Sequence, residues 1–144
     1  MKVLLDTSVL VAAMVEAHPA HERALPWLQR AKRKEVTTVV ASHTLAELYA
    51  ILTRLPVQPP ISPAVAWQLI RENVLAALEV VSLSEDDYRA VLEHLSQMGI
   101  VGGATYDALI AYAASKATVD QLVTLNEKDF RRVYPDLSEQ IVAP

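Results

Sequence analysis

The chain has 144 residues, of which 52% are hydrophobic and 21% are charged, and it contains no Cys. This length suits one domain, which we expect to cover residues 1–144, and the apolar content excludes an intrinsically disordered chain. A cysteine-free chain cannot be a secreted scaffold held together by disulfides. The net charge of −4 argues at first sight against a nucleic-acid partner.

No segment of the sequence suggests targeting or membrane insertion. The apolar run at residues 3–5 is too short for the core of a signal peptide. The longest later apolar stretch, residues 104–114, is interrupted by Asp107 and falls short of the ~20 residues that a bilayer requires. We therefore expect a cytoplasmic protein that does not contact a membrane.

The first part of the chain alternates between short β-branched or apolar runs and stretches with helical spacing. In chain order, the patterns predict a strand at residues 3–5, helices at 8–15 and 18–34, a strand at 36–41 and a helix at 43–55. Pro26 is expected to kink or divide the second of these helices. Ser42 is expected to cap the third helix.

The rest of the chain continues the same alternation. In order, the patterns predict a loop at residues 55–60, a helix from 62 to about 77, a strand at 80–83, a helix ending at 99, a helix at 104–117, and strands at 121–124 and 140–142. Ser62 followed by Pro63 is a typical helix start. Ser84 and Asp87 resemble a capping box, and Gly99 ends the helix that they begin.

Strands separated by helices along the chain predict βα units and a parallel sheet covered on both faces. We therefore expect an α/β fold in which a central parallel β-sheet is flanked by helices. No internal repeat, low-complexity tract or linker interrupts the pattern, so the prediction is one continuous domain.

Two acidic residues draw attention by their positions. Asp107 lies on an Ala-rich helix that is apolar nearly all round, the pattern of a buried helix. A carboxylate there is costly unless it is paired or bound to a cation, or it favours the helix dipole from the first turn. Asp6 directly follows the first strand, at the sheet edge where α/β proteins bind ligands, although it could also cap the next helix.

Two further acids are less distinctive on their own. Glu47 lies in the middle of a helix, where it can pair with His43 four residues earlier. Asp129 follows the fourth strand at the same sheet edge as Asp6, and it could equally cap a short helix. Converging carboxylates without Cys suit a hard cation such as Mg²⁺ or Mn²⁺. Such an ion polarises a phosphoryl group and lowers the pKa of a bound water, so the pattern predicts phosphodiester hydrolysis without a covalent intermediate.

The net charge depends on these acids. Asp6, Glu47, Asp107 and Asp129 together account for all of the −4, so the rest of the chain is neutral overall. A cluster of Arg and Lys at residues 30–34 is either a solvated helix end or a patch that follows phosphates. Because a metal ion would neutralise the acids, the net charge does not exclude RNA as a substrate.

Four ordered segments resemble the PIN-domain nucleases, and in particular the VapC-type toxins of toxin–antitoxin pairs. The segments are VLLDTSVLVA, SHTLAELYAIL, GGATYDALIAYAA and LVTLNEKDF. The resemblance covers about residues 2–134. It implies a PIN fold and an endoribonuclease that depends on Mg²⁺ or Mn²⁺.

The resemblance also assigns roles to individual residues. It places the metal-binding and catalytic acids at Asp6, Glu47, Asp107 and Asp129. Many relatives have Asp where this chain has Asn126, so Asp129 is taken as the fourth acid, with Asn126 as a neutral participant and one ion rather than two. Thr7 or Ser8 matches the hydroxyl residue that orients the site, and Thr124 matches a supporting position.

The resemblance further implies a homodimer and a small VapB-like antitoxin, whose C-terminal segment occupies a groove near the active site. An alternative hypothesis is a catalytically inactive PIN-like module that binds protein. In that case the acids only cap helices and pair with Lys or Arg. Neutralising Asp6 or Asp107 would then lower stability and leave metal affinity unchanged.

Overall fold

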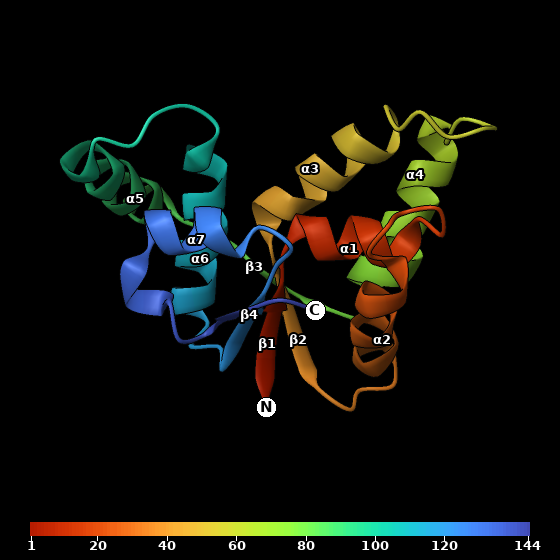
Figure 1. Cartoon of the computed structure of the whole chain (residues 1–144), viewed down its shortest axis with the longest axis horizontal. Helices are drawn as coiled ribbons and strands as arrows, with labels where there is room; N and C mark the ends of the chain where they lie inside the picture. Colours follow the sequence, from red (N-terminus) through yellow and green to blue (C-terminus); the bar gives the residue numbers. More distant parts are fainter.

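The structure is a computed structural model that describes residues 1–144, and its strands form one sheet (Figure 1). The strands are β1 (Lys2–Leu5), β2 (Thr37–Ala41), β3 (Glu79–Val81), β4 (Gln121–Val123) and β5 (Ile141–Val142). Every neighbouring pair is parallel, and the strand order is β3-β2-β1-β4-β5. The predicted α/β fold with a central parallel sheet is confirmed.

Seven α-helices connect and flank the strands. They are α1 (Thr7–Met14), α2 (His21–Lys32), α3 (Ser42–Leu52), α4 (Pro63–Ile70), α5 (Glu85–Met98), α6 (Ala104–Lys116) and α7 (Glu127–Val133). A π-helical turn at Arg71–Leu75 continues α4, and a 3-10 turn at Pro135–Leu137 follows α7. None of the helices combines the length and the apolar character needed to cross a bilayer.

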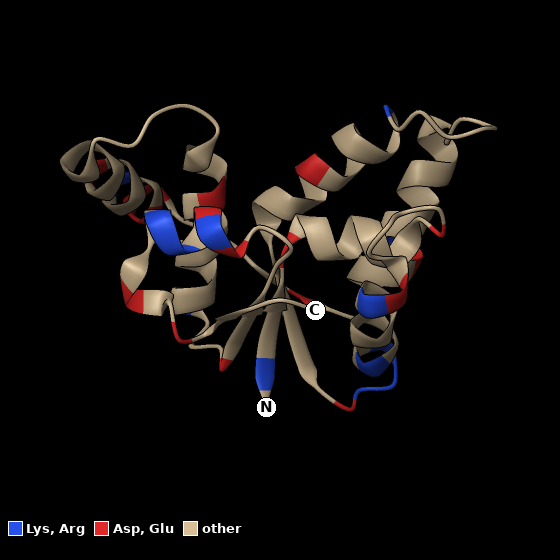
Figure 2. Ribbon diagram, viewed as in Figure 1, with Lys and Arg blue, Asp and Glu red and all other residues tan.

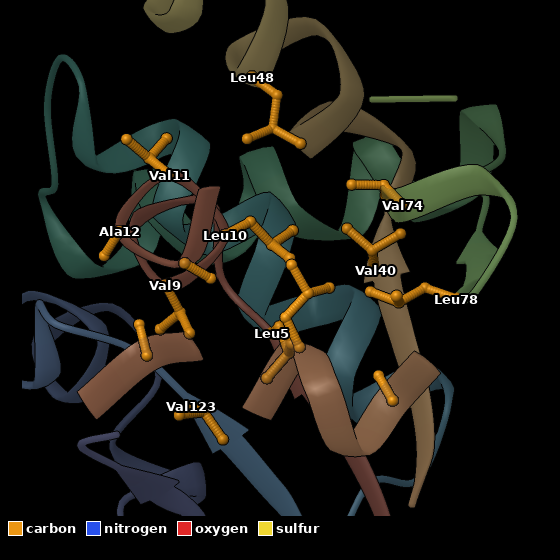
Figure 3. Close-up of a cluster of buried hydrophobic side chains, with 14 of the residues drawn as sticks. Leu5, Val9, Leu10, Val11, Ala12, Val40, Leu48, Val74, Leu78 and Val123 are labelled. Carbon is orange, nitrogen blue, oxygen red and sulfur yellow. The ribbon is translucent and has the colours of Figure 1, made fainter. Parts of the chain in front are cut away.

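Alternating side chains of the strands bury two separate layers. Val3 and Leu5 pack in a cluster with residues of α1 to α4, whereas Leu4 packs in another cluster with residues of α6 and α7. In Figure 1, α1 to α4 lie on one side of the sheet and α5 to α7 on the other. Figure 3 shows the first layer, where Leu10 and Val40 lie around Leu5. Burial on both faces explains why the strands have apolar runs rather than polar alternation.

One local prediction is wrong, and one of two alternatives for Pro26 is excluded. Ser42 is the first residue of α3 and not its cap, since Ala41 occupies the cap position with an extended backbone and no side chain caps this helix. Pro26 does not divide α2, which continues through it. A proline inside a helix removes one hydrogen bond and crowds the carbonyl four residues earlier, but the buried face of α2, including Leu28, still packs against the core.

The helix signals in the middle of the chain are confirmed. Ser62 Oγ accepts a hydrogen bond from the Val65 N–H (3.2 Å). Ser84 and Asp87 bond reciprocally to each other's backbone N–H, which forms the predicted capping box. Gly99 ends α5 with a φ of +67°, a left-handed conformation that favours glycine.

The strand order creates a switch point beside β1. From β1 the chain passes to β2 and then β3 on one side, and it later returns to β4 and β5 on the other side. Connections diverge at such a boundary, and ligands of open α/β sheets bind there, beyond the carboxyl ends of the strands. The residues that follow β1 and β4 therefore occupy the expected binding edge.

Candidate active site at the carboxyl edge of the sheet

Asp6 lies at this edge, directly after β1, and is only 3% exposed. Its backbone N–H donates to the Val123 carbonyl (3.0 Å), which extends the pairing between β1 and β4. Its Oδ2 accepts hydrogen bonds from Ser8 Oγ (2.7 Å) and Thr124 Oγ1 (2.8 Å). Although Asp6 stands at the cap position of α1, its side chain makes no capping bond. The two hydroxyls, rather than the helix, orient this carboxylate.

Ser8 and Thr124 are themselves held by the loop after β4. Ser8 Oγ accepts from the Leu125 N–H (3.1 Å), and Thr124 Oγ1 accepts from the Asn126 N–H (3.0 Å). Each hydroxyl thus accepts a hydrogen bond from a backbone N–H and donates a hydrogen bond to Asp6. This arrangement suits an ionised carboxylate, because an ionised carboxylate only accepts hydrogen bonds.

Glu47 reaches the same edge from α3 and is half-buried. Thr7 Oγ1 donates to Glu47 Oε1 (3.0 Å), and the hydroxyls of Thr7 and Thr44 lie 3.0 Å apart. His43 Nε2 lies 3.7 Å from Glu47 Oε1, so the expected pairing within the helix is present as well. The neighbouring residues Thr7 and Ser8 therefore donate hydrogen bonds to two different acids, Glu47 and Asp6.

Asp107 and Asp129 approach the edge from the first turns of α6 and α7. Asp107 is half-buried and not enclosed as the apolar pattern of its helix suggested, although Ile110 and Ala114 on its face are buried. The difference arises because Asp107 stands where α6 emerges at the sheet edge. Asp129 is exposed, and the cap position of α7 belongs to Asn126, whose side chain makes no capping bond.

Burial makes the two inner acids harder to ionise. It raises the pKa of the Asp6 carboxyl above its ordinary value, and hydrogen bonds from Ser8 and Thr124 act in the opposite direction. Burial also raises the pKa of Glu47, against the hydrogen bond from Thr7. The charge of His43 also lowers the pKa of Glu47, whereas no Lys, Arg or His forms an ion pair with Asp6.

The negative charges of the other acids affect the pKa of Asp107. Burial, followed by the negative charges of Asp6, Asp129 and Glu47, raises the pKa of Asp107 to about 6, and the positive charge of Arg132 only partly opposes this. The other three acids therefore lie within electrostatic reach of Asp107. Perturbed carboxylates gathered at a ligand-binding edge are a recognised feature of functional sites.

Lys and Arg side chains do not neutralise this group. None of the four acids forms an ion pair with Lys or Arg. Figure 2 shows that the basic end of α2 lies at the opposite end of the sheet from the acidic positions of α3, α6 and α7. There, Arg33 lies 3.9 Å from Glu35 and Arg30 lies over the Trp27 ring at 5.1 Å. The cluster at residues 30–34 therefore lies apart from the acids.

The acids and hydroxyls fit a hard divalent cation. They offer only oxygen ligands, which Mg²⁺ and Mn²⁺ prefer. No group of three or more His, Asp or Glu side chains is arranged closely enough to hold an ion by protein ligands alone. Mg²⁺ usually retains several waters and takes one or two carboxylates directly, so this spacing suits a hydrated ion. A cation would also relieve the repulsion that raises the pKa of Asp107.

Sequence reasoning missed two features of the site. Thr44 is fully buried and hydrogen-bonded to Thr7; its position three residues before Glu47 on the same helix face could have revealed it. The ring of His43 stacks on Tyr106, with centroids 4.8 Å apart and planes 8° from parallel. No local pattern signals this second contact, because it joins α3 to α6.

Fold and site together define an α/β protein with carboxylates at the switch point of a parallel sheet. Residues 3–135 match the PIN domain family, and the chain belongs to this family. It is 34% identical to Ribonuclease VapC40 of Mycobacterium tuberculosis over 128 residues, which cover 89% of this chain and 87% of that protein.

Two solved structures share the fold. VapBC2 from Rickettsia felis, bound to a DNA fragment from its promoter, matches with a TM-score of 0.69 and 24% identity over 100% of this chain and 99% of that chain. VapC20 of Mycobacterium tuberculosis, described as a Sarcin-Ricin loop cleaving toxin, matches with a TM-score of 0.66 and 16% identity over 83% and 86%. At these identities the likeness concerns the fold alone.

Proposed function

We propose that this chain is an endoribonuclease that depends on Mg²⁺ or Mn²⁺ and hydrolyses RNA phosphodiester bonds. The observation that carries the proposal is that three carboxylates lie within electrostatic reach of Asp107 at one sheet edge, and none of the four has a Lys or Arg ion-pair partner. Membership of the PIN domain family and the similarity to Ribonuclease VapC40 support RNA as the substrate. In this proposal residues 1–144 act as one domain.

In this proposal the polar residues of the edge have two roles: the acids bind the ion, and the hydroxyls orient the acids. The acids that would hold one hydrated divalent ion, directly or through its waters, are Asp6, Glu47, Asp107 and Asp129. When bound, such an ion polarises the phosphoryl group and makes an attacking water more acidic. Ser8 and Thr124 keep Asp6 oriented, Thr7 does the same for Glu47, and Asn126 offers a neutral polar side chain beside Asp129. Without a cation, the acids would repel an RNA phosphate.

A cleavage assay tests this function. The wild-type protein should cleave RNA in Mg²⁺ or Mn²⁺ and lose this activity in EDTA. Asp107→Asn should cleave more slowly by about 100-fold or more, because it removes charge at the reacting centre. Asp87→Asn, which changes an aspartate in the first turn of another helix, is the matched control and should cleave like the wild type. Equal cleavage by the wild type and Asp107→Asn, or activity that persists in EDTA, contradicts the proposal.

We also propose that the chain is the toxin of a toxin–antitoxin pair, a cytoplasmic homodimer that a small VapB-like antitoxin inhibits. The VapBC2 complex and the VapC20 toxin support this biology. The exposed Tyr49 on α3 and Trp67 on α4 offer apolar surface for a partner chain. Expression of the chain alone should arrest bacterial growth, and co-expression of the small neighbouring reading frame should restore it. Normal growth on expression of the chain alone contradicts this assignment.

A further inference from the structure

Tyr106 is an exposed aromatic residue that directly precedes Asp107. It is 50% exposed, and residues 101–103 before it are exposed as well. Gly102 and Gly103 carry no side chain, and an added Cβ at either would meet no atom within 4 Å. The start of α6 therefore leaves the Tyr106 ring accessible beside the acids.

One face of this ring is covered by an aromatic partner from another helix. His43 on α3 stacks on Tyr106 with the ring centroids 4.8 Å apart and the planes 8° from parallel. The contact restricts the orientation of the tyrosine, because its partner belongs to a separate element. With this face covered, the opposite face and the edge of the ring account for the exposed half of Tyr106.

His43 is a firm support for that ring. Its side chain is only 22% exposed, and its Nε2 lies 3.7 Å from Glu47 Oε1 without forming a hydrogen bond. The His43–Tyr106 pair thus spans the two helices that carry Glu47 and Asp107. An exposed tyrosine held in this way is pre-organised, so little conformational entropy is lost when a ligand packs against it.

We propose that the open face of Tyr106 stacks on a nucleobase of single-stranded RNA beside the scissile bond; this inference rests on the proposed ribonuclease function. Proteins recognise unpaired RNA bases by stacking them on aromatic side chains, and such stacking tolerates any sequence. The acids repel phosphates, and the basic end of α2 lies far from them. Although Arg132 on α7 partly offsets the acids, an uncharged ring next to Asp107 supplies affinity that does not depend on charge.

Binding of a labelled single-stranded oligoribonucleotide of mixed sequence, followed by fluorescence anisotropy, tests the inference. The variants are made in the otherwise wild-type protein, and binding is measured in Ca²⁺, which takes oxygen ligands as Mg²⁺ does, with a gel to verify that the oligonucleotide stays intact. Tyr106→Ala and Tyr106→Leu should weaken binding by about 5- to 150-fold, since base stacking is lost. Tyr106→Phe retains the ring and should restore binding. Tyr88→Ala on α5, which removes a tyrosine of similar exposure (39%), is the matched control and should leave binding unchanged.

Three outcomes overturn the stacking role. They are unchanged binding in Tyr106→Ala, an equal loss in Tyr106→Phe and Tyr106→Ala, and a loss of Mn²⁺ affinity in the otherwise wild-type Tyr106→Leu protein. The last outcome would mean that the His43–Tyr106 pair only positions the acids. Tyr106→Leu keeps an apolar side chain and guards against a folding defect, which thermal melting monitors. Failure of the ribonuclease proposal looks different, because the wild type itself would then not cleave RNA.

Discussion

Asp87 in the first turn of α5 and Asp107 in the first turn of α6 have opposite surroundings. In α5, Asp87 accepts hydrogen bonds from Lys116 Nζ (2.6 Å) and the Ser84 N–H (2.8 Å), which lower its pKa to about 2. In α6, burial and acidic neighbours raise the pKa of Asp107 to about 6. The same residue type in the first turn of a helix has a lowered pKa in one place and a raised pKa in the other.

This contrast separates structural from functional use of charge. A carboxylate that serves a helix start has partners, as Asp87 has Lys116 and the capping box with Ser84. Asp107 and its acidic neighbours form no ion pair with Lys or Arg, and the fold tolerates this repulsion. Sites that break the usual rules of polar burial in this way are expected where function requires it. The following substitutions test whether the two kinds of carboxylate differ in this way.

The largest effect is expected from neutralising the acids singly and together. Asp6→Asn and Glu47→Gln should each lower the rate of RNA cleavage by about 100-fold or more. The double variant should lose little more than either single variant, because the acids act as a unit around one ion. Glu85→Gln, which removes an exposed acid paired with Arg89 at the start of α5, is the control. Losses that multiply in the double variant would show that the acids act independently.

A smaller effect is expected from the hydroxyl that orients Asp6. Thr124→Val keeps the buried shape and removes the 2.8 Å hydrogen bond to Asp6. Cleavage should fall by about 10- to 100-fold, the usual cost of losing a residue that orients a metal ligand. Thr38→Val is the matched control, since Thr38 is also buried and donates to the Val36 carbonyl on a strand that carries no acid. Equal activity losses in the two variants would mean that Thr124 acts through stability alone.

The two first-turn aspartates should differ in sign when the metal-free protein is unfolded with urea at pH 7. Asp107→Asn should raise the free energy of unfolding, because it relieves burial and repulsion of a charge. Asp87→Asn should lower it, because the bond to Lys116 and half of the capping box are lost. If Asp107 only favours the helix dipole, Asp107→Asn will instead cost about 0.3–1 kcal/mol.

The same pair should show opposite pH dependence in the metal-free protein. Asp87 has a lowered pKa in the folded state, so its contribution is present above pH 3.8 and is lost as the pH falls through about 2. Asp107 has a raised pKa in the folded state. Below pH 3.8 its carboxyl is protonated in both states and does not oppose folding, and this stability is lost as the pH rises through about 6. Unfolding free energies of the wild type minus each Asn variant, measured from pH 2 to pH 7, check both signs. Parallel curves for the two positions would refute the contrast.

The sequence was informative where a residue's place follows from strand and helix order. Asp6 and Thr124 directly follow strands, and the carboxyl ends of parallel strands share one edge, so their proximity could be predicted. Asp107 was found because a carboxylate is out of place on an apolar helix. The fold class could be predicted because strands that alternate with helices along the chain form a parallel sheet.

The other features of the site and the exact helix boundaries depend on tertiary contacts, which local sequence patterns do not encode. Ser42 has the residue type of a helix cap but lies one position too late, since the backbone turns at Ala41. Nothing near Glu47 in the sequence shows that Thr7 donates to it from α1. The stack of His43 on Tyr106 likewise depends on how α3 and α6 meet.

The most direct test of the central claim is thermal melting of the wild type, Asp107→Asn and Asp87→Asn with and without Mn²⁺. If the unpaired acids bind a cation, the wild type and Asp87→Asn should gain about 2.7 kcal/mol of stability at a metal concentration of 100 times the Kd. Asp107→Asn should gain little or nothing at that concentration. A wild type that Mn²⁺ does not stabilise, or an Asp107→Asn protein that it stabilises equally, contradicts the account.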